Sequence, residues 1–158
     1  ERIVASGAPR PDLQIVLTIC EEIGLVGASL IDPARLRARY GFVLDAGPPV
    51  GGIVRAAPAQ DSIRVKVVGT PAHAGAEPEK GVSAIVAASR AVAAMRLGRI
   101  DPQTSANVGT IHGGTARNIV PAEVQLVCEA RSRDNALLDA QTAHMKETFE
   151  REAAAVGA

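Results

Sequence analysis

Two stretches of the chain alternate strictly between apolar and polar side chains, and this two-residue period restricts the fold more than any other feature. Residues 62–69 and 123–131 both keep the period. Their apolar side chains are Ile63, Val65, Val67, Val124, Leu126, Cys128 and Ala130. Because successive side chains of a strand point to opposite faces, both stretches are predicted to be strands with one buried and one solvated face.

The segments around these stretches predict an α+β module. Apolar residues recur at helical spacing in residues 81–97 and 135–155, and residues 105–112 have the pattern of another strand. The order strand, helix, strand, strand, helix is that of a ferredoxin-like sandwich without its last strand. We therefore expect this module over residues 61–158, with one strand edge left open for pairing with another chain.

The first part of the chain has a different pattern. Residues 13–20 are a near-continuous apolar run, which is typical of a strand buried on both faces. A short helix is predicted at residues 29–40 and a second buried strand at residues 42–44. Strand, helix and strand, with polar residues at the strand ends, favour a partial α/β domain over residues 1–60.

Composition excludes several classes of partner. The 158 residues carry 17 basic and 17 acidic side chains, and only 2% are aromatic, so neither nucleic acid nor an anionic membrane is an expected partner. No apolar run approaches the roughly 18 residues of a membrane span, and no signal peptide opens the chain. Cys20 and Cys128 lie in apolar runs and are expected to be buried free thiols. These features predict a soluble cytoplasmic protein.

Three carboxylates follow the predicted strands of the first part. Adjacent charges at Glu21 and Glu22 repel one another, and a divalent cation relieves the repulsion when one carboxylate binds it and the other faces water. The alternative is a solvated pair that caps the next helix. Asp45 follows the next strand and would approach the same rim of a parallel sheet, unless it only forms an Asx turn before Gly47. Two carboxylates with histidine from elsewhere suit zinc.

Two loops of the second part carry further polar candidates. Pro71 and small residues stiffen the loop around His73 and would leave its imidazole projecting. The glycine-rich loop 113–121 carries Asn118, whose amide is both donor and acceptor. Ordinary solvation is the alternative for His73.

Arg131 ends a strand on its polar face, and its guanidinium fork suits a carboxylate, although a plain surface charge is equally consistent with the pattern. His112, beside a glycine pair, and His144, near the apolar stripe of the last helix, are expected to be structural.

Together these segments resemble the two-zinc metallopeptidase family that includes peptidase T, acetylornithine deacetylase, succinyl-diaminopimelate desuccinylase and aminoacylase, and the peptidase T-like tripeptide aminopeptidases above all. The resemblance covers nearly the whole chain. It is carried by Cys20-Glu21-Glu22-Ile23-Gly24, Leu44-Asp45-Ala46-Gly47, Gly69-Thr70-Pro71-Ala72-His73-Ala74-Gly75, Gly113-Gly114-Thr115 and Asn118-Ile119-Val120-Pro121.

The resemblance implies a role for each candidate. Glu21 is the general base, Glu22 binds one zinc and Asp45 binds the other, with cobalt or manganese as possible replacements. The module at 61–158 is then the family's lid, which mediates homodimerisation. Its His73 reaches the active site of the partner subunit and stabilises the oxyanion. The last two candidates, Asn118 and Arg131, match positions that hold the substrate's backbone or terminal carboxylate.

The chain also departs from the family pattern. Family members need a His-x-Asp pair and a bridging Asp upstream and a His downstream, and this sequence has none of them. We therefore expect an internal fragment, inactive alone, of a parent that hydrolyses small peptides such as tripeptides. The alternatives are a parent acting on N-acyl amino acids or dipeptides, a piece whose only activity is dimerisation, and a ferredoxin-like domain that binds a small regulatory molecule.

Overall fold

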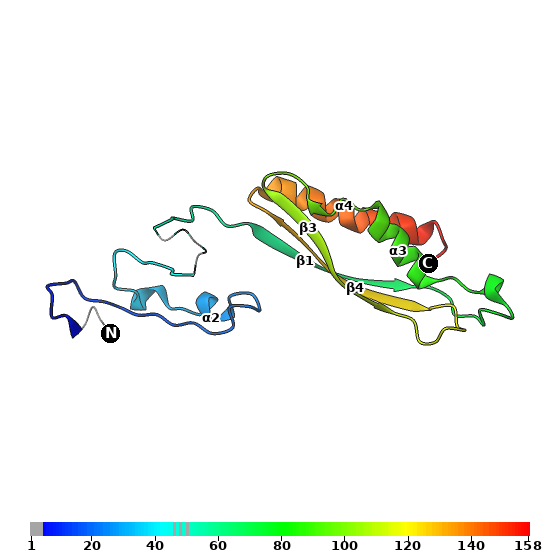
Figure 1. Cartoon of the computed structure of the whole chain (residues 1–158), viewed down its shortest axis with the longest axis horizontal. Coiled ribbons are helices and arrows are strands. Elements are labelled where there is room, and N and C mark those ends of the chain that lie inside the picture. Colours follow the sequence, from blue (N-terminus) through cyan, green and yellow to red (C-terminus); the bar gives the residue numbers. More distant parts are fainter. Residues whose placement is uncertain (1–4, 46, 48, 50) are drawn as a thin grey trace. The chain divides into compact units, whose positions relative to one another are not determined.

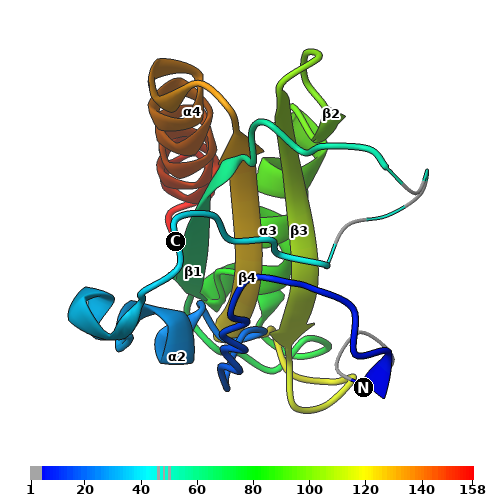
Figure 2. The same ribbon diagram turned by 90° about the vertical axis from the view of Figure 1, so that its left-hand side faces the viewer.

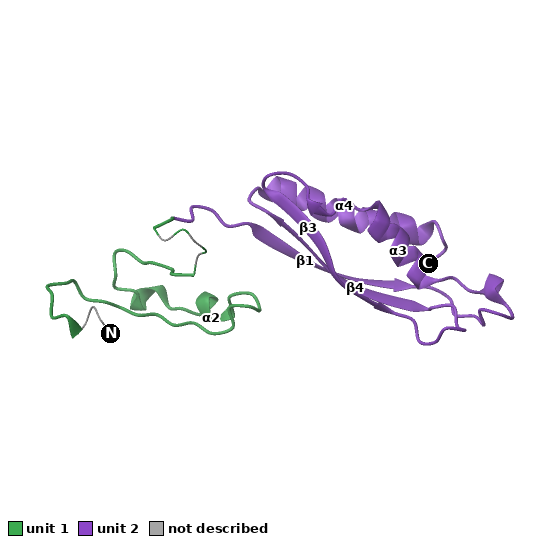
Figure 3. Ribbon diagram, viewed as in Figure 1, with its two compact units in different colours: residues 1–52 green, residues 53–158 purple. Residues whose placement is uncertain are grey.

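The computed structural model describes residues 5–45, 47, 49 and 51–158. The chain divides into two compact units, residues 1–52 and residues 53–158 (Figures 1 and 3). Each unit is described by itself. Among the described residues, no helix combines the length and the apolar character needed to cross a membrane.

The second unit is built on an antiparallel sheet with the strand order β1-β4-β3-β2. Its strands are β1 (Ala59–Val68), β2 (Gly98–Arg99), β3 (Thr104–Gly113) and β4 (Glu123–Ser132). The predicted alternation in β1 and β4 is confirmed, because Ile63, Val67, Leu126 and their neighbours on one face are buried while the other face is exposed. Within the described residues β1 has no partner on its outer edge.

Two helices, α3 (Ala84–Ala94) and α4 (Asn135–Ala154), cover one face of this sheet; in Figure 2 α3 is seen behind the strands and α4 beside β1. The observed α+β order matches the expected order of strand, helix, strand, strand, helix, with the two-residue strand β2 added after α3. Asp134 caps α4 by accepting the N–H groups of Ala136 and Leu137 at 2.8 and 3.2 Å. The expected apolar stripe of α4 is confirmed by its buried members Leu138, Met145 and Phe149.

The buried face of α3 differs from the one expected. The sequence pattern pointed to the bulky residues, yet Ile85 and Val86 are 39% and 50% exposed. The residues of α3 that are buried are Ala84, Ala87, Ala88 and Ala91. Small side chains let the helix lie close to the sheet and to α4, so the alanines rather than the branched residues face the core.

Side chains of α4 also tie the helical layer together. The Gln141 Nε2 donates to the Arg96 carbonyl at 2.9 Å, and the His144 Nε2 accepts the Arg96 N–H at 3.2 Å. Both bonds satisfy backbone groups just after α3, which confirms the structural role expected for His144. A further bond of 2.6 Å joins the Thr142 hydroxyl to the Asp61 carboxylate and so links α4 to β1.

The secondary-structure predictions for the first unit are wrong where the structure describes them. Neither residues 13–20 nor residues 42–44 form a strand, and Leu17 and Leu44 are 89% and 93% exposed. A strand needs a neighbour that accepts and donates its backbone hydrogen bonds, and the described part of this unit supplies none. Cys20 is likewise exposed, while Cys128 is buried; both thiols are free.

The helix expected at residues 29–40 is also absent. In its place are α2 (Val26–Ser29) and a single 3₁₀ turn, η1 (Pro33–Arg35). Asp32 accepts the Ala34 N–H at 3.0 Å and caps the turn. Because Pro33 has no N–H to donate, the chain restarts at the proline instead of continuing from α2.

Candidate functional site

The two loops that carry His73 and Asn118 are hydrogen-bonded to each other at one end of the sheet. They extend β1 and β4: the Ala74 N–H donates to the Asn118 carbonyl, and the Val120 N–H donates to the Ala72 carbonyl, both at 2.9 Å. His73 pairs with Ile119 as an antiparallel bridge. The chain order alone, with these loops far apart, gave no reason to expect this direct pairing.

The pairing includes a local irregularity. Val68 lies opposite Glu123 in the sheet, and the bridge beyond it joins His73 to Ile119. Five residue steps on the β1 side therefore oppose four on the β4 side. An extra residue of this kind bends a strand and re-aims its side chains, and here it falls between Val68 and His73, where Thr70 pairs with Val82 instead.

The imidazole of His73 is exposed but its orientation is defined. Its Nδ1 accepts two backbone hydrogen bonds, from the N–H groups of Gly75 at 3.2 Å and Ala76 at 3.1 Å. An Nδ1 that accepts two bonds carries no proton, so the neutral ring has its hydrogen on Nε2. His73 therefore presents a hydrogen-bond donor to whatever lies beyond the loop.

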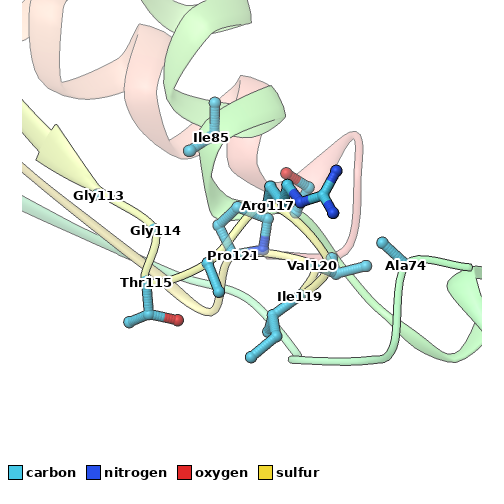
Figure 4. A pocket seen from close by; sticks show the side chains of 11 residues that line it. Ala74, Ile85, Gly113, Gly114, Thr115, Arg117, Ile119, Val120 and Pro121 are labelled. Carbon is cyan, nitrogen blue, oxygen red and sulfur yellow. The ribbon is translucent and has the colours of Figure 1, made fainter.

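A pocket of about 530 Å³ opens at loop 113–121 (Figure 4), and Asn118 is not among the residues that line it. Its walls come from loop 113–121, from Ala74 and from the start of α3, including Ile85. Gly114 has φ +80° and a Cβ added to it would lie 3.4 Å from the Ile85 Cδ1, so the glycine keeps this wall open. Among the described residues that line it, Arg117 is the single charged one.

Arg131 lies at the other end of the sheet. It is eight residues beyond Glu123 along β4, which is about 26 Å at about 3.3 Å per residue. Its guanidinium binds the Glu129 carboxylate through both Nε and Nη2, at 3.1 and 3.0 Å. The structure thus joins the loops of His73 and Asn118 through their backbones and keeps Arg131 of the same chain away from them.

In the first unit, Glu21 and Glu22 lie on a tight turn. The Glu21 carbonyl accepts the N–H groups of Gly24 and Leu25 at 3.2 and 3.0 Å. The residues on either side, Cys20 and Leu25, both have φ +58°, a left-handed conformation that is uncommon for residues other than glycine. Such strain is concentrated at functional sites, which makes this turn a candidate for holding two carboxylates in a set direction.

Known proteins identify the second unit. The sequence family described as the peptidase dimerisation domain of M20 peptidases matches residues 60–156. The chain belongs to this family. The match contains the whole four-stranded sheet apart from the first residue of β1, together with α3 and α4.

Solved structures of peptidases are similar to the chain beyond the dimerisation domain. An aminopeptidase PepT from Bacillus cereus shares 51% identity at a TM-score of 0.80, over 89% of this chain and 38% of that one. A tripeptidase from Staphylococcus aureus shares 44% at a TM-score of 0.82, over 88% and 37%. The acetylornithine deacetylase of Myxococcus xanthus is 38% identical over 133 residues, which are 75% of this chain and 34% of the relative. The chain thus spans less than two fifths of each.

The described residues do not complete a metal site by themselves. No group of three or more His, Cys, Asp or Glu side chains able to hold an ion occurs in the part of the chain that the structure describes. Asp45 is exposed, and its neighbour Ala46 lies outside the described residues. Carboxylates such as Glu22 and Asp45 suit zinc as individual ligands, but a zinc centre needs three or four protein ligands.

Sequence reasoning missed two features of the dimerisation domain. The first is the turn that holds His73. Its sequence signal is weak, because it consists only of Gly75 and Ala76 following the histidine by two and three residues. The second is Arg117, whose place at the pocket follows from how loop 113–121 packs against α3. An isolated arginine in a loop has no sequence signature of its own.

Proposed function

We propose that the chain is part of a homodimeric metal-dependent peptidase that hydrolyses small peptides, tripeptides first among them. Glu21 is the general base, Glu22 and Asp45 are zinc ligands, and His73 stabilises the oxyanion. Asn118 and Arg131 hold the substrate's backbone or terminal carboxylate. The likeness to a tripeptidase and an aminopeptidase, over nearly nine tenths of the chain, supports this reaction class.

The observation that carries the proposal is the paired loops with their defined histidine. Hydrolysis of an amide places negative charge on the carbonyl oxygen in the transition state. A donor already aimed at that oxygen stabilises the charge without reorganising during the reaction. The Nε2–H of His73 is such a donor, because the Gly75 and Ala76 N–H groups bind the opposite nitrogen.

The two carboxylates of the strained turn have complementary roles in this reaction. Glu21 takes a proton from the attacking water and returns it to the leaving amine. Glu22 contributes one metal ligand and Asp45 another, and the remaining ligands come from segments that the much longer relatives contain. Two bound zinc ions, or cobalt or manganese, would polarise the scissile carbonyl. Alone, the 158-residue chain is expected to be inactive.

The length of the sheet supports a dimeric active site. A tripeptide spans about 10 Å, while the end of the sheet with His73 lies about 26 Å along β4 from Arg131. One chain therefore cannot bring both side chains to one substrate. A second copy of the dimerisation domain solves this problem, since each chain then supplies His73 and Asn118 to its partner's substrate.

The substrate class has a second candidate, and the proposal also covers the partners and the location of the protein. Deacylation of N-acyl amino acids is the second candidate, because one relative is named an acetylornithine deacetylase. The balanced charge gives no support for nucleic acid or membrane as a partner, and we place the protein in the cytoplasm.

Mixed dimers of the full gene product test the proposal. Glu21→Gln alone should abolish tripeptide hydrolysis and leave the metal content near normal, whereas equal loss of metal would show that Glu21 is a ligand. Mixing inactive Glu21→Gln chains with inactive His73→Ala chains should restore about a quarter of wild-type activity, since half the dimers then hold one complete site. No recovery in dimers shown to exchange would refute the shared site, and zinc-dependent hydrolysis by the 158-residue chain would refute its inactivity.

A further inference from the structure

The outer edge of β3 is free over one segment, residues 107–113. The two-residue strand β2 covers that edge only at Ser105 and Ala106 (Figure 2). Beyond them, among the described residues, no strand pairs with β3 on the side away from β4. Such an edge offers unpaired backbone N–H and C=O groups, which are a template for a strand of another chain.

In the described part of the chain the sheet has a second free edge, at β1, and the two edges differ in charge. β1 carries three charged residues, Asp61, Arg64 and Lys66, whereas the free segment of β3 contains no Asp, Glu, Lys or Arg. Charged side chains on an edge strand discourage pairing with another chain. Asp61 also binds the Thr142 hydroxyl and so ties α4 to β1. The chemistry therefore favours β3 as the edge that takes a partner.

Gly109, inside the free segment, has no reason within its own chain to be glycine. It is the extra residue of a β-bulge between Val108 and Thr110. A bulge requires glycine only where φ is positive, and the φ of Gly109 is not. A Cβ added to it would lie 3.5 Å from the Val127 carbonyl oxygen, which is an ordinary contact. A strand glycine that its own chain does not require marks a place where another backbone approaches closely.

Apolar side chains beside the free segment are exposed. Ile111 lies opposite Leu126, so it points to the face of the sheet that the helices cover, yet it is 48% exposed. Ile85 of α3 is 39% exposed, and a Cβ added at Gly114 would lie 3.4 Å from its Cδ1, which places Ile85 next to the end of β3. A second copy that extended the sheet, with its helices on the same face, would remove both isoleucines from water.

The extent of the free segment determines how two copies can pair. β2 leaves the edge free only from Asn107 onward, and β3 itself ends at Gly113, where Gly114 with φ +80° turns the chain out of the strand. In a symmetric dimer each copy presents the same surface to the other. Two antiparallel segments that match over their whole length therefore have Thr110 at the two-fold axis.

We propose that a second copy of this chain pairs antiparallel with residues 107–113 of β3, with Thr110 at the two-fold axis, so that two sheets become one. Gly109 of each copy then faces the partner's Ile111, which gives the missing Cβ a reason, and the helices of both copies lie on the same face. The proposal rests on the homodimer of the proposed function, and it names the surface that forms this dimer.

This register brings together residues that one chain keeps apart. Counted from Thr110, the partner's Ser105 is level with residue 115, in loop 113–121. Within each chain Ser105 pairs with Arg131. The partner's Arg131 therefore lies about two strand spacings, or about 10 Å, from the line of β3 at that level. The separation of about 26 Å within one chain becomes a length that a tripeptide of about 10 Å can span.

Cysteine cross-linking of the 158-residue chain tests the register. In a Cys20→Ser background, which removes the exposed thiol, Thr110→Cys places two thiols at the two-fold axis. Opposite residues of antiparallel strands have Cα atoms about 4.5–5.5 Å apart, which is close enough for a disulfide. His112→Cys is the matched control, because its two copies would lie four residue steps, or about 13 Å, apart along the strand.

We expect the yield of disulfide-linked dimer to be at least about tenfold higher for Thr110→Cys than for His112→Cys, since only the first pair meets the distance limit. Equal yields from the two variants, or no linked dimer from Thr110→Cys, would overturn the register.

Sedimentation velocity of single variants measures the strength of the interface, with circular dichroism to show that each variant is folded. Gly109→Ala should weaken dimerisation by about tenfold or more, because the added methyl fits its own chain and meets only the partner. Ile111→Lys should weaken it further, since pairing would bury the charge. Val127→Lys is the control, at a position that is 38% exposed on β4, inside the sheet. A dimer lost in Val68→Lys on β1 but kept in Ile111→Lys would refute the assignment to β3.

The same measurements separate this proposal from the proposed function. A Thr110→Cys dimer, in a protein whose full gene product hydrolyses no peptide, would support the surface and refute the peptidase. Peptide hydrolysis by dimers that Gly109→Ala and Ile111→Lys leave intact would support the peptidase and refute the surface. A chain that stays monomeric across micromolar concentrations would refute the surface as well.

Discussion

The two units of this chain contain equally apolar segments with opposite fates. In the second unit Leu126 is 1% exposed, at the centre of a strand with partners on both sides. In the first unit Leu17 is 89% exposed, in a run that the sequence pattern also assigns to a strand. The difference shows that an apolar run becomes a strand only where the chain also supplies the neighbouring strands.

Matched leucine substitutions test this comparison with the largest expected effect. Leu126→Ala should lower the free energy of unfolding by about 2–5 kcal/mol, because it leaves a cavity in a packed core. Leu17→Ala should change it by less than about 0.5 kcal/mol, since the side chain is already solvated. Urea denaturation of both variants, followed by far-ultraviolet circular dichroism, is the measurement. Comparable losses in the two variants would mean that the first unit has a core of its own.

The same comparison explains which parts of the fold were predictable. Alternation in β1 and β4, and the stripe of α4, report burial against neighbours that lie in the same module, so these elements were predicted nearly to their ends. The alanine face of α3 was missed because small residues carry little hydrophobic signal. The strand expected at residues 13–20 is absent for a different reason: its apolar pattern is that of a strand with neighbours on both sides, and the described residues supply no such neighbours.

The candidate site was predictable residue by residue but not as an arrangement. The motifs singled out His73 and Asn118 separately, and their pairing depends on the register of β1 and β4 beyond the sheet. Nor does the sequence give the distance from the His73 end of the sheet to Arg131, because that distance depends on the length and direction of β4. A motif specifies side-chain chemistry, whereas the strand geometry decides which side chains can serve one substrate.

Glycine substitutions sharpen the comparison at the backbone level. A Cβ added at Gly69 would lie 2.0 Å from the Val82 carbonyl oxygen, so Gly69→Ala must move the loop that leads to His73 and should cost about 1–3 kcal/mol. Gly41→Ala is the control in the first unit, because no atom lies within 4 Å of that position, and its effect should stay below about 0.5 kcal/mol. A neutral Gly69→Ala variant would contradict the close packing of this loop against residue 82.

A substitution at residue 75 tests the defined histidine with a smaller effect. Gly75→Pro removes one of the two N–H groups that bind the His73 Nδ1, and a net hydrogen bond of about 0.5–1.5 kcal/mol corresponds to a two- to tenfold change in the tautomer ratio. Gly75→Ala keeps the N–H and adds a Cβ at an ordinary 3.6 Å from the ring. Imidazole ¹⁵N shifts report the tautomer directly. A wild-type ring protonated mainly on Nδ1 would contradict the geometry.

The smallest expected effect is a pH dependence confined to the second unit. Burial, with help from the charges of Arg96 and Arg151, lowers the pKa of His144 below its usual 6.5, and the neutral ring accepts the Arg96 N–H. As the pH falls below about 6.5, the unfolded chain takes up this proton before the folded chain does, so the stability must decrease. Denaturation midpoints should therefore fall more between about pH 7.5 and about pH 5.5 for the wild type than for His144→Gln, which does not titrate.

This last measurement also separates the two units. Amide exchange in residues 13–20 should keep the same protection factors with and without the substitution, because the hydrogen bonds of His144 among the described residues go to Arg96 and Thr148 of the second unit. Equal pH slopes for the wild type and His144→Gln would mean that the ring exchanges its Arg96 partner for water at no cost. A change of protection in residues 13–20 would instead show that the stability of the first unit depends on the core of the second, and that the two units do not unfold independently.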